Sequence, residues 1–486
     1  MNQKQATAYI LDLARAGAFD FALKEYHRLK LDHECHDEDV MALLGRLYKD
    51  RYLAGSPANT QEAAQLSVQA YEKAFIASGG FYSGINAASM SFVAGDEPVK
   101  IAMKAQDILT LLPSTPQLNA EVLYFIEATR AEAFLLLGQR NKARSALKLA
   151  WNYDPLNYIA HASTLKQFHM IEKHQGADSF WLDSFNPPRS MHFTGHVFNS
   201  SIFSMEQLET FRESISSAIQ QQDVGFGFGA LAAGADIEFA EALLAEGCEL
   251  HVFLPSDIET FVENSILPFG QEWLPRFRVC LDRAESFTIA QWIGSTTGAE
   301  QTRRAQQHTS VLSMGSALHL AQLHLVDAIQ MAFWDGVKSS TGTGWDVAIW
   351  EAQNLSRINF SVPKEHPKKP KTHISPYSYH AFLSGVDMQM QSFPVLQDAI
   401  LAGFIARNEN PEHPVVLELA TYPNTPPSED RIRTLLDAAL PGSFIVSQSA
   451  ASHANLFCPR TVAVSKFEIL SSGEQLFALS PLPNLY

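Results

Sequence analysis

A run of alternating glycines near the middle of the chain limits the folds that this sequence can adopt. Gly225, Gly227 and Gly229 stand at every second position, and small residues continue to Gly234. Glycine permits positive φ and a close approach of the backbone to a ligand. The run therefore predicts a glycine-rich turn that opens a helix at Gly234. Residues 249–255 follow with β-branched and aromatic side chains, so the segment predicts a compact turn–helix–strand unit.

A second strand and a second glycine-rich helix start follow further along the chain. Residues 328–334 predict a buried strand that ends at Asp335 and Gly336, and Gly342 with Thr343 begins another helix. Free N–H groups at a helix start, together with the positive end of the helix dipole, attract anions such as phosphate. Open α/β sheets bind ligands where two such strand ends meet. We therefore expect a nucleotide between the two glycine-rich helix starts.

The pattern resembles the SLOG superfamily, which includes the DNA-processing protein A fold and the cytokinin-activating "lonely guy" phosphoribohydrolases. A first strand ends at Gly195, residues 231–237 begin the next helix, and Gly342 with Thr343 caps a later one. The resemblance covers residues 188–362 and implies a Rossmann-like parallel sheet that binds a nucleotide-derived ligand. A simpler interpretation, in which the glycines only allow tight turns between strands and helices, stays open.

Two departures from known motifs favour binding over catalysis. The dinucleotide fingerprint G-x-G-x-x-G has Ala230 in place of its third glycine, and the next acidic residue comes too early. The lonely-guy enzymes carry Pro-Gly-Gly-x-Gly-Thr followed by a pair of glutamates. Residues 339–346 lack the leading Pro-Gly-Gly and keep a single carboxylate, Asp346. The resemblance therefore implies a binding domain without catalytic residues.

Polar and aromatic side chains near these glycines complete the predicted ligand site. Two aspartates are suited to ribose hydroxyls, two tryptophans to stacking on a base, and two adjacent arginines to paired hydrogen bonds with phosphate. These are, in order, Asp335 and Asp346, Trp334 and Trp345, and Arg303 and Arg304. For each arginine, a surface ion pair is the competing interpretation. The predicted ligand-binding set is Gly195, Gly225, Gly227, Gly229, Gly234, Asp236, Arg303, Arg304, Trp334, Asp335, Gly336, Gly342, Thr343 and Asp346.

Residues 1–183 predict stacked helix pairs. The expected helices, from their apolar spacing, are 6–16, 19–29, 40–51, 61–77, 82–93, 99–112, 120–137 and 142–153. The last pair resembles a tetratricopeptide repeat, and residues 82–88 resemble the helical TRAF-binding region of the apoptosis-signal-regulating kinases. Such an array implies a concave surface for a protein partner. A purely architectural role is the alternative.

The C-terminal part of the chain resembles class III nucleotidyl cyclases. After a Pro- and Lys-rich linker at 363–373, residues 374–486 carry segments similar to the opening strand and helix, a later strand and the terminal hairpin, at 380–395, 441–451 and 466–480. Cyclases use aspartates to hold two metal ions. Here Ser384 takes the first of these positions and Asp387 comes too late. The resemblance implies a degenerate domain that serves packing, dimerisation or ligand sensing.

The overall charge confines any anionic ligand to a local pocket. Lys plus Arg number 36 and Asp plus Glu number 52, so the formal net charge is −16, which argues against binding duplex nucleic acid or anionic membranes. The cysteines are far apart, and His33, Glu34, Cys35 and His36 have no second cluster beside them, so we expect no metal. No signal or membrane-spanning segment is visible, which predicts a cytoplasmic protein.

These patterns together predict a multidomain α plus α/β protein: an N-terminal α-solenoid (1–183), a central Rossmann-like domain (188–362) and a C-terminal α+β domain (374–486). SLOG domains and cyclases occur together in bacterial nucleotide-signalling and antiviral systems. The resemblances therefore imply a sensor or effector that responds to a nucleotide-derived messenger through a protein partner or self-association. We expect a homo-oligomer, because cyclase-type domains usually work as pairs. Hydrolysis of an N-glycosidic bond in a nucleotide or NAD, and an inert scaffold, are the alternatives.

Overall fold

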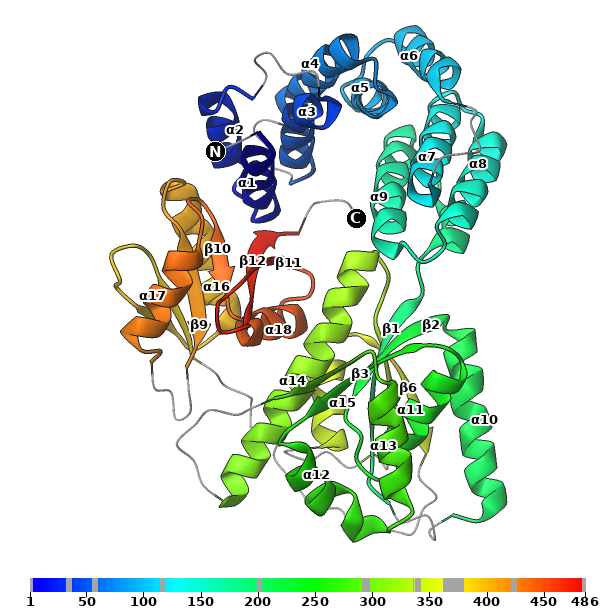
Figure 1. The fold of residues 1–486 in the computed structure, drawn as a ribbon, viewed down its shortest axis with the longest axis vertical. Coiled ribbons are helices and arrows are strands. Elements are labelled where there is room, and N and C mark those ends of the chain that lie inside the picture. Colours follow the sequence, from blue (N-terminus) through cyan, green and yellow to red (C-terminus); the bar gives the residue numbers. More distant parts are fainter. Residues whose placement is uncertain are drawn as a thin grey trace.

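The computed structural model in Figure 1 describes residues 3–31, 37–54, 60–113, 119–198, 203–290, 298–334, 336, 342–361, 380–420 and 426–482. The chain is mostly helical, with repeat-like helices, one parallel sheet and one mixed sheet. Asp335, the predicted linker and the His33–His36 cluster lie outside the described residues. Among the helices of these ranges, none has the length and apolar character needed to cross a membrane.

The N-terminal helices stack in consecutive pairs. They are α1 (Gln3–Arg15), α2 (Phe19–Arg28), α3 (Glu38–Leu53), α4 (Thr60–Ser78), α5 (Phe81–Val93), α6 (Pro98–Leu111), α7 (Ala120–Leu136), α8 (Arg140–Tyr153) and α9 (Tyr158–Gln175). Each expected helix is present within a few residues of its predicted bounds. Small residues make the stacking close, since an added Cβ at Gly84 in α5 would lie 2.3 Å from Ile108 in α6. At such positions the two helix axes approach one another closely.

The strands of the first sheet run parallel. They are β1 (Arg189–Gly195), β2 (Val224–Gly229), β3 (Glu249–Leu254), β4 (Ser286–Ile289), β5 (Ile329–Trp334) and β6 (Ser356–Ser361), in the order β4-β3-β2-β1-β5-β6. The helices among them are α10 (Met205–Gln221), α11 (Ala235–Ala245), α12 (Ile258–Ser265), α13 (Trp273–Arg283), α14 (Gly298–His324) and α15 (Thr343–Ala352). The strand order reverses direction between β1 and β5, as in a doubly wound sheet.

The predicted glycine-rich turn at Gly225, Gly227 and Gly229 is wrong, because all three residues lie in β2. Glycine alternates with phenylalanine in this strand, so one face carries rings that pack against α14. The other face is smooth, and an added Cβ at Gly227 would lie 2.2 Å from Leu243 of α11. The glycines therefore allow α11 to pack closely on the sheet, and the turn before that helix is confined to residues 230–234.

The second sheet is mixed. Its strands are β7 (Ala381–Ser384), β8 (Gln391–Phe393), β9 (Val415–Leu419), β10 (Phe444–Val446), β11 (Val462–Ile469) and β12 (Gln475–Pro481), in the order β11-β12-β10-β9-β7-β8. Neighbours β9 and β10 are parallel, and the other neighbouring pairs are antiparallel. Its helices are α16 (Leu396–Glu409), α17 (Glu429–Ala438) and α18 (Gln448–Phe457). The expected closing hairpin is present as β11 and β12, whereas the expected opening strand is a hairpin, β7 and β8, before α16.

Helix α14 joins the two sheets (Figure 1). An added Cβ at Gly315 would lie 2.5 Å from the carbonyl oxygen of Ser452 in α18, so the two helices touch backbone to backbone. Further along α14, the Gln322 side chain donates to the carbonyl of Val462 (2.8 Å) and accepts from the N–H of Val464 (3.1 Å). The amide of Gln322 thus pairs with β11 as a neighbouring strand would.

The turn between α1 and α2 also packs against the C-terminal part of the chain, at α16 and β12. Arg407 of α16 donates to the carbonyl oxygen of Ala16 at 3.3 Å, and burial lowers the pKa of this guanidinium to about 10. Gly17 has a φ of 73°, and an added Cβ there would lie 2.8 Å from Ser480 of β12. The last helix of the array, α9, packs on α14. Both ends of the helical array are therefore held by the rest of the chain.

Replacing Gly315 with valine tests how far stability depends on the contact between α14 and α18. The new side chain would collide with the backbone of Ser452, so we expect Gly315→Val to lower the free energy of unfolding by about 1–3 kcal/mol. Ser316→Val adds the same β-branched residue at the next, half-buried position and should cost less than about 1 kcal/mol. Urea titrations followed by circular dichroism measure both losses, and equal losses would contradict the prediction.

Candidate functional site

The carboxyl ends of β1 and β5 are the place where a doubly wound sheet binds ligands, and we call this region the switch-point edge. The two strands are neighbours, with Gly195 opposite Phe333. Helices α11 and α15 both begin at this edge, because each follows a strand of the parallel sheet. Gly234 is the N-cap residue of α11 and Gly342 that of α15, and neither helix start has a side-chain cap. The structure thus brings the two predicted helix starts to one edge.

The start of α15 has no close neighbour among the described residues. Gly342 has a φ of 61°, and no atom of a described residue lies within 4 Å of an added Cβ, so its backbone conformation calls for glycine. Behind it, the Thr194 hydroxyl of β1 donates to Asp346 Oδ2 at 2.8 Å and holds α15 against the strand. The first N–H groups of the helix lack partners in the helix itself and point along its axis toward the switch-point edge.

The start of α11 is covered by the chain itself. Gly234 has a φ of 105°, and an added Cβ would lie 2.6 Å from the backbone nitrogen of Phe198. The N–H of Ala235 donates to the carbonyl of His196 at 3.3 Å. The close approach that Gly234 permits is therefore to residues 196–198, and a phosphate at this helix start would have to displace them.

Two buried carboxyl groups flank the end of β1, one at the start of each helix. Asp236 accepts hydrogen bonds from the N–H of Gly195 at Oδ1 (2.9 Å) and from the N–H of Ala232 at Oδ2 (3.2 Å). Burial raises the pKa of Asp236 well above its usual value, and the nearby Asp346 raises it further. Burial also raises the pKa of Asp346 to about 6, although a hydrogen bond from Ser310 lowers it in part. Both groups anchor the switch-point edge, and burial makes their charged forms less favourable than in water.

A polar layer beneath this edge was missed from the sequence. Ser190, His192 and Thr194 alternate along β1 and are all buried. Gln330 of β5 pairs with His192 Nδ1 at 3.1 Å, and the Trp350 ring of α15 stacks on the same histidine with 5.9 Å between centroids. Burial lowers the pKa of His192 to about 3, so the ring is neutral. The polar residue at every second position of β1 was the signal that indicates this layer.

Arg303 and Arg304 lie on α14. Ser310 of α14 is close enough to Asp346 to lower its pKa by a hydrogen bond. Arg303 precedes Ser310 by two helical turns on the same helix face, about 10 Å further along the axis. Both arginines bind Glu300, through Nε of Arg303 at 2.7 Å and Nε of Arg304 at 2.9 Å. The structure thus shows both arginines in ion pairs with Glu300 of their own helix, as the competing interpretation expected.

The two tryptophans that were expected to stack on a base lie in different surroundings. Trp345 is fully buried among Val311 and Met314 of α14, so its predicted stacking on a base is wrong. Trp334 is 8% exposed, and the Arg357 guanidinium lies 5.3 Å from the centre of its ring. Gly336 has a φ of 88° and open space around it, at the end of β5.

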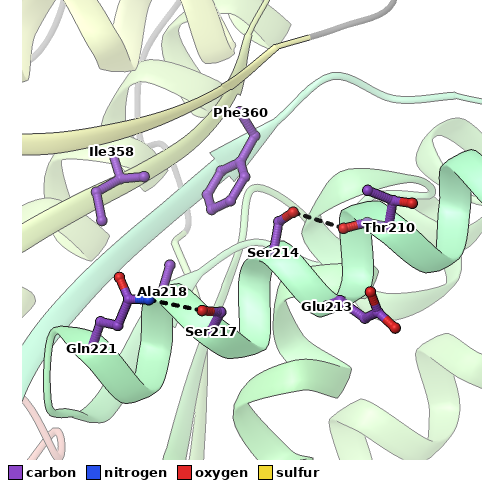
Figure 2. A pocket seen from close by; sticks show the side chains of 8 residues that line it. All are labelled: Thr210, Glu213, Ser214, Ser217, Ala218, Gln221, Ile358 and Phe360. Atoms are coloured by element: carbon purple, nitrogen blue, oxygen red, sulfur yellow. Dashed lines mark hydrogen bonds between the residues drawn. The ribbon is translucent and has the colours of Figure 1, made fainter.

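Two adjoining hollows lie elsewhere, between α10 and the edge strand β6. One, of about 430 Å³, is drawn in Figure 2 and is lined by Thr210, Glu213, Ser214, Ser217, Ala218, Gln221, Ile358 and Phe360. The other, of about 470 Å³, reaches Phe203 and Phe333. Two serines line the helix side: Ser214 donates to the carbonyl of Thr210 at 2.7 Å, and Ser217 accepts from Gln221 at 2.9 Å. None of the predicted ligand-binding residues lines either hollow.

In the mixed sheet, the positions expected to be cyclase-like carry no exposed carboxylate pair among the described residues. Ser384 ends β7 and is buried, and Asp387 lies in the following turn, where it accepts from the N–H of Gln389 at 3.1 Å. Glu418 of β9 is occupied, since it accepts hydrogen bonds from Ser447 (2.6 Å) and Arg431 (2.9 Å). An ion-paired carboxylate of this kind serves packing.

A family comparison supports the helical repeats. Residues 2–91 match the family model described as "Tetratricopeptide Repeats-Sensor", which covers α1 to α4 and most of α5. No curated protein matches the chain. Among solved structures, a mutant of the O-GlcNAc transferase of Thermobaculum terrenum is similar at 12% identity, with a TM-score of 0.18 and coverage of 60% of this chain and 46% of that one. The chain thus spans less than half the length of that relative.

Asp346→Asn tests whether this carboxyl group costs stability at neutral pH. Its folded-state pKa of about 6 lies above the ordinary 3.8, so the folded protein binds the proton more tightly than the unfolded chain does. Proton binding to Asp346 therefore stabilises the folded protein fully below the pKa of the unfolded chain. This stabilisation is lost as the pH rises through the folded-state pKa. We expect Asp346→Asn to be more stable than wild type by about 1–3 kcal/mol at about pH 8, and to lose this advantage at about pH 4. Urea titrations at both pH values measure the difference, and a constant difference would refute the prediction.

A cyclase assay tests the C-terminal domain. With Ser384 buried and Glu418 bound to Arg431, we expect no cyclic product from ATP or GTP with Mg²⁺ or Mn²⁺. The measurement is mass spectrometry of the reaction mixture with homogeneous full-length protein. A cyclic nucleotide that disappears on mutation within residues 380–395 would contradict the expectation.

Proposed function

We propose that the switch-point edge binds the phosphate of a nucleotide-derived ligand and that the protein acts as a sensor or effector of such a messenger. One observation carries the proposal: α15 begins at the reversal of strand order with a glycine N-cap and no side-chain cap. We expect Arg303 and Arg304 of α14 to reach the same ligand. N–H groups at a helix start and guanidinium groups both bind phosphate oxygens. The SLOG-like, Rossmann-like interpretation of residues 188–362 belongs to the same proposal.

The unfavourable burial of a carboxyl group at this site supports a binding role. Asp346 is 5% exposed, and a buried carboxyl group with a pKa of about 6 destabilises the folded protein at neutral pH. Its hydrogen bond from Thr194 fixes the position of α15 relative to β1. Asp346 is therefore a positioning residue for the helix start, and the ligand meets Gly342 first, which is exposed.

The output we propose is self-association or binding of a protein partner by the helical array. The description "Sensor" in the matching family supports this direction for residues 2–91. A homo-oligomer, a cytoplasmic location and a place in bacterial antiviral signalling are further parts of the proposal. Light scattering with and without ligand at micromolar protein would test self-association, and a strictly monomeric mass in both conditions would count against it.

Hydrolysis of an N-glycosidic bond is the second candidate. One observation favours it: Asp346 and Asp236 both have raised pKa values and lie close enough to interact, as a general acid and base would. Both oxygens of Asp236 are engaged by backbone N–H groups, which favours an anchoring role. Release of free base from nucleotides or NAD would decide for the enzyme.

Substitutions at the start of α15 test the proposed phosphate site. Binding of mononucleotides, cyclic di- and trinucleotides, NAD and ADP-ribose derivatives is measured by thermal shift and calorimetry on the wild type. A ligand at 100 times its dissociation constant should add about 2.7 kcal/mol to stability. We expect Gly342→Val to abolish this gain and Thr343→Val to weaken binding by about 1–3 kcal/mol.

Gly138→Val is the matched control for Gly342→Val. Gly138 has a φ of 70° with open space around it, so it imposes the same backbone strain as Gly342 at a place far from the site. Binding should be unchanged in this control. A ligand that binds Gly342→Val and Thr343→Val as well as the wild type would place the site elsewhere. A panel without a binder would favour the scaffold alternative.

A further inference from the structure

The odd-numbered helices form the inner wall of the N-terminal array. Contacts join α1 with α3, α3 with α5, α5 with α7 and α7 with α9, and α5 also touches α9 directly. The even-numbered helices contact their neighbours in sequence. In a stacked array of helix pairs, the concave layer is formed by the helices that contact one another across an intervening helix. Helices α3, α5, α7 and α9 therefore converge on one region, which we call the inner wall.

Buried polar side chains link these four helices. The Lys49 ammonium of α3 donates to Asn86 Oδ1 of α5 at 2.8 Å. Ser89 of α5 donates to the Glu132 carboxylate of α7, which also accepts from Gln167 Nε2 of α9 at 2.7 Å. Asn86, Ser89 and Glu132 are at most 9% exposed. The network contains Asn86, one of the residues that resemble the TRAF-binding region.

Cationic groups gather at the same place. Lys49 and Lys166 of α9 are both half-buried, and each is near enough to Arg46 of α3 for the guanidinium to lower its pKa. Burial lowers the pKa of Lys49 to about 8, and Lys166 lowers it further. Arg46 makes an ion pair with Asp50 at 3.6 Å. Cations from two helices that are distant in sequence thus meet on the inner wall.

These cations outnumber the carboxyl groups beside them. The one hydrogen bond that Lys49 makes within the described residues goes to a neutral amide. Lys166 makes no hydrogen bond or direct ion pair with a described residue, although Asp50 is near enough to raise its pKa. Glu132 and Asp50 are both near enough to Lys49 to raise its pKa, so two carboxyl groups stand beside three cations. A half-buried group of like charges of this kind is stabilised when an anion enters.

We propose that the inner wall is a second anion site, in which Arg46, Lys49 and Lys166 bind the phosphate groups of a small molecule. Tyr82, 39% exposed, lies near Arg46, and its hydroxyl is hydrogen-bonded to Tyr71. Lysine binds phosphate as a point charge and arginine through paired hydrogen bonds. Asp50 and Glu132 beside the cations disfavour an extended acidic chain. Four converging helices favour a compact, multiply charged anion.

Competitive labelling of lysines tests the site on the intact wild-type protein. A limiting amount of an acylating reagent is applied with and without inorganic pyrophosphate, and each lysine is read by mass spectrometry. An amine with a lowered pKa reacts faster, so Lys49 should be labelled readily in the free protein. We expect pyrophosphate to slow the labelling of Lys49 and Lys166 several-fold. Lys100, whose side chain is 64% exposed, is the internal control and should not change.

A pair of variants tests the affinity. Lys166→Gln removes one cation, and we expect the dissociation constant for pyrophosphate, measured by calorimetry, to rise about tenfold or more. Lys100→Gln removes an exposed lysine of the same array and should leave the constant unchanged. Equal constants in both variants would overturn the proposal. Circular dichroism of each variant confirms that the helices are retained.

Two further arms identify the ligand class and the site. A hexaglutamate peptide replaces pyrophosphate in the labelling experiment, and protection by the peptide alone would overturn the phosphate assignment in favour of an acidic protein partner. Protection by neither would overturn the anion site. The labelling is repeated on Gly342→Val, which blocks the proposed nucleotide site at α15. Lys49 should still be protected there, and loss of protection would mean that the anion acts from the switch-point edge.

Discussion

The close contact between α14 and its surroundings is the constraint on which the rest of the structure depends. One face of this helix lies under β1, where the Ser190 hydroxyl donates to the carbonyl of Ala317 at 2.6 Å. On another side Gly315 admits the backbone of α18, and α9 packs on α14 as well. Small side chains are needed wherever two backbones approach so closely. A helix buried in this way has a fixed position, and its Ser310 is therefore held beside Asp346 at the switch-point edge.

Local patterns in the sequence predict the elements well, and long-range packing decides the rest. The helices of the array follow from apolar spacing, and the starts of α11 and α15 follow from Gly234 and Gly342. The run at residues 225–229 shows why one pattern can mislead: glycine permits a turn, but it also permits a strand that a helix can approach closely. The strand is favoured because Leu243 of α11 packs closely against Gly227. A contact between two separate elements leaves no trace in a local sequence pattern.

The candidate site was predictable in outline and not in detail. The two helix starts and the arginines were expected there, whereas burial separates residues that sequence cannot tell apart. Trp345 and Trp334 look alike in sequence, yet Trp345 fills the core beneath α14. Asp346 was expected to meet a ribose and is held by Thr194 under the helix start. Burial depends on which elements pack together, so it follows from the fold and not from spacing.

The arrangement of the three parts gives the two proposed sites a common mechanical element. The helical array is held at α1 by the contact of Arg407 with Ala16 and at α9 by its packing on α14. An anion that draws α3 toward α9 on the inner wall changes the curvature of an array whose ends are both fixed. That change has to be taken up at one of the two end contacts. The contact at α9 leads to α14, which also carries Ser310 beside Asp346. We therefore propose α14 as the element whose position both ligands would bias, and an element shared in this way is the physical requirement for coupling between two sites.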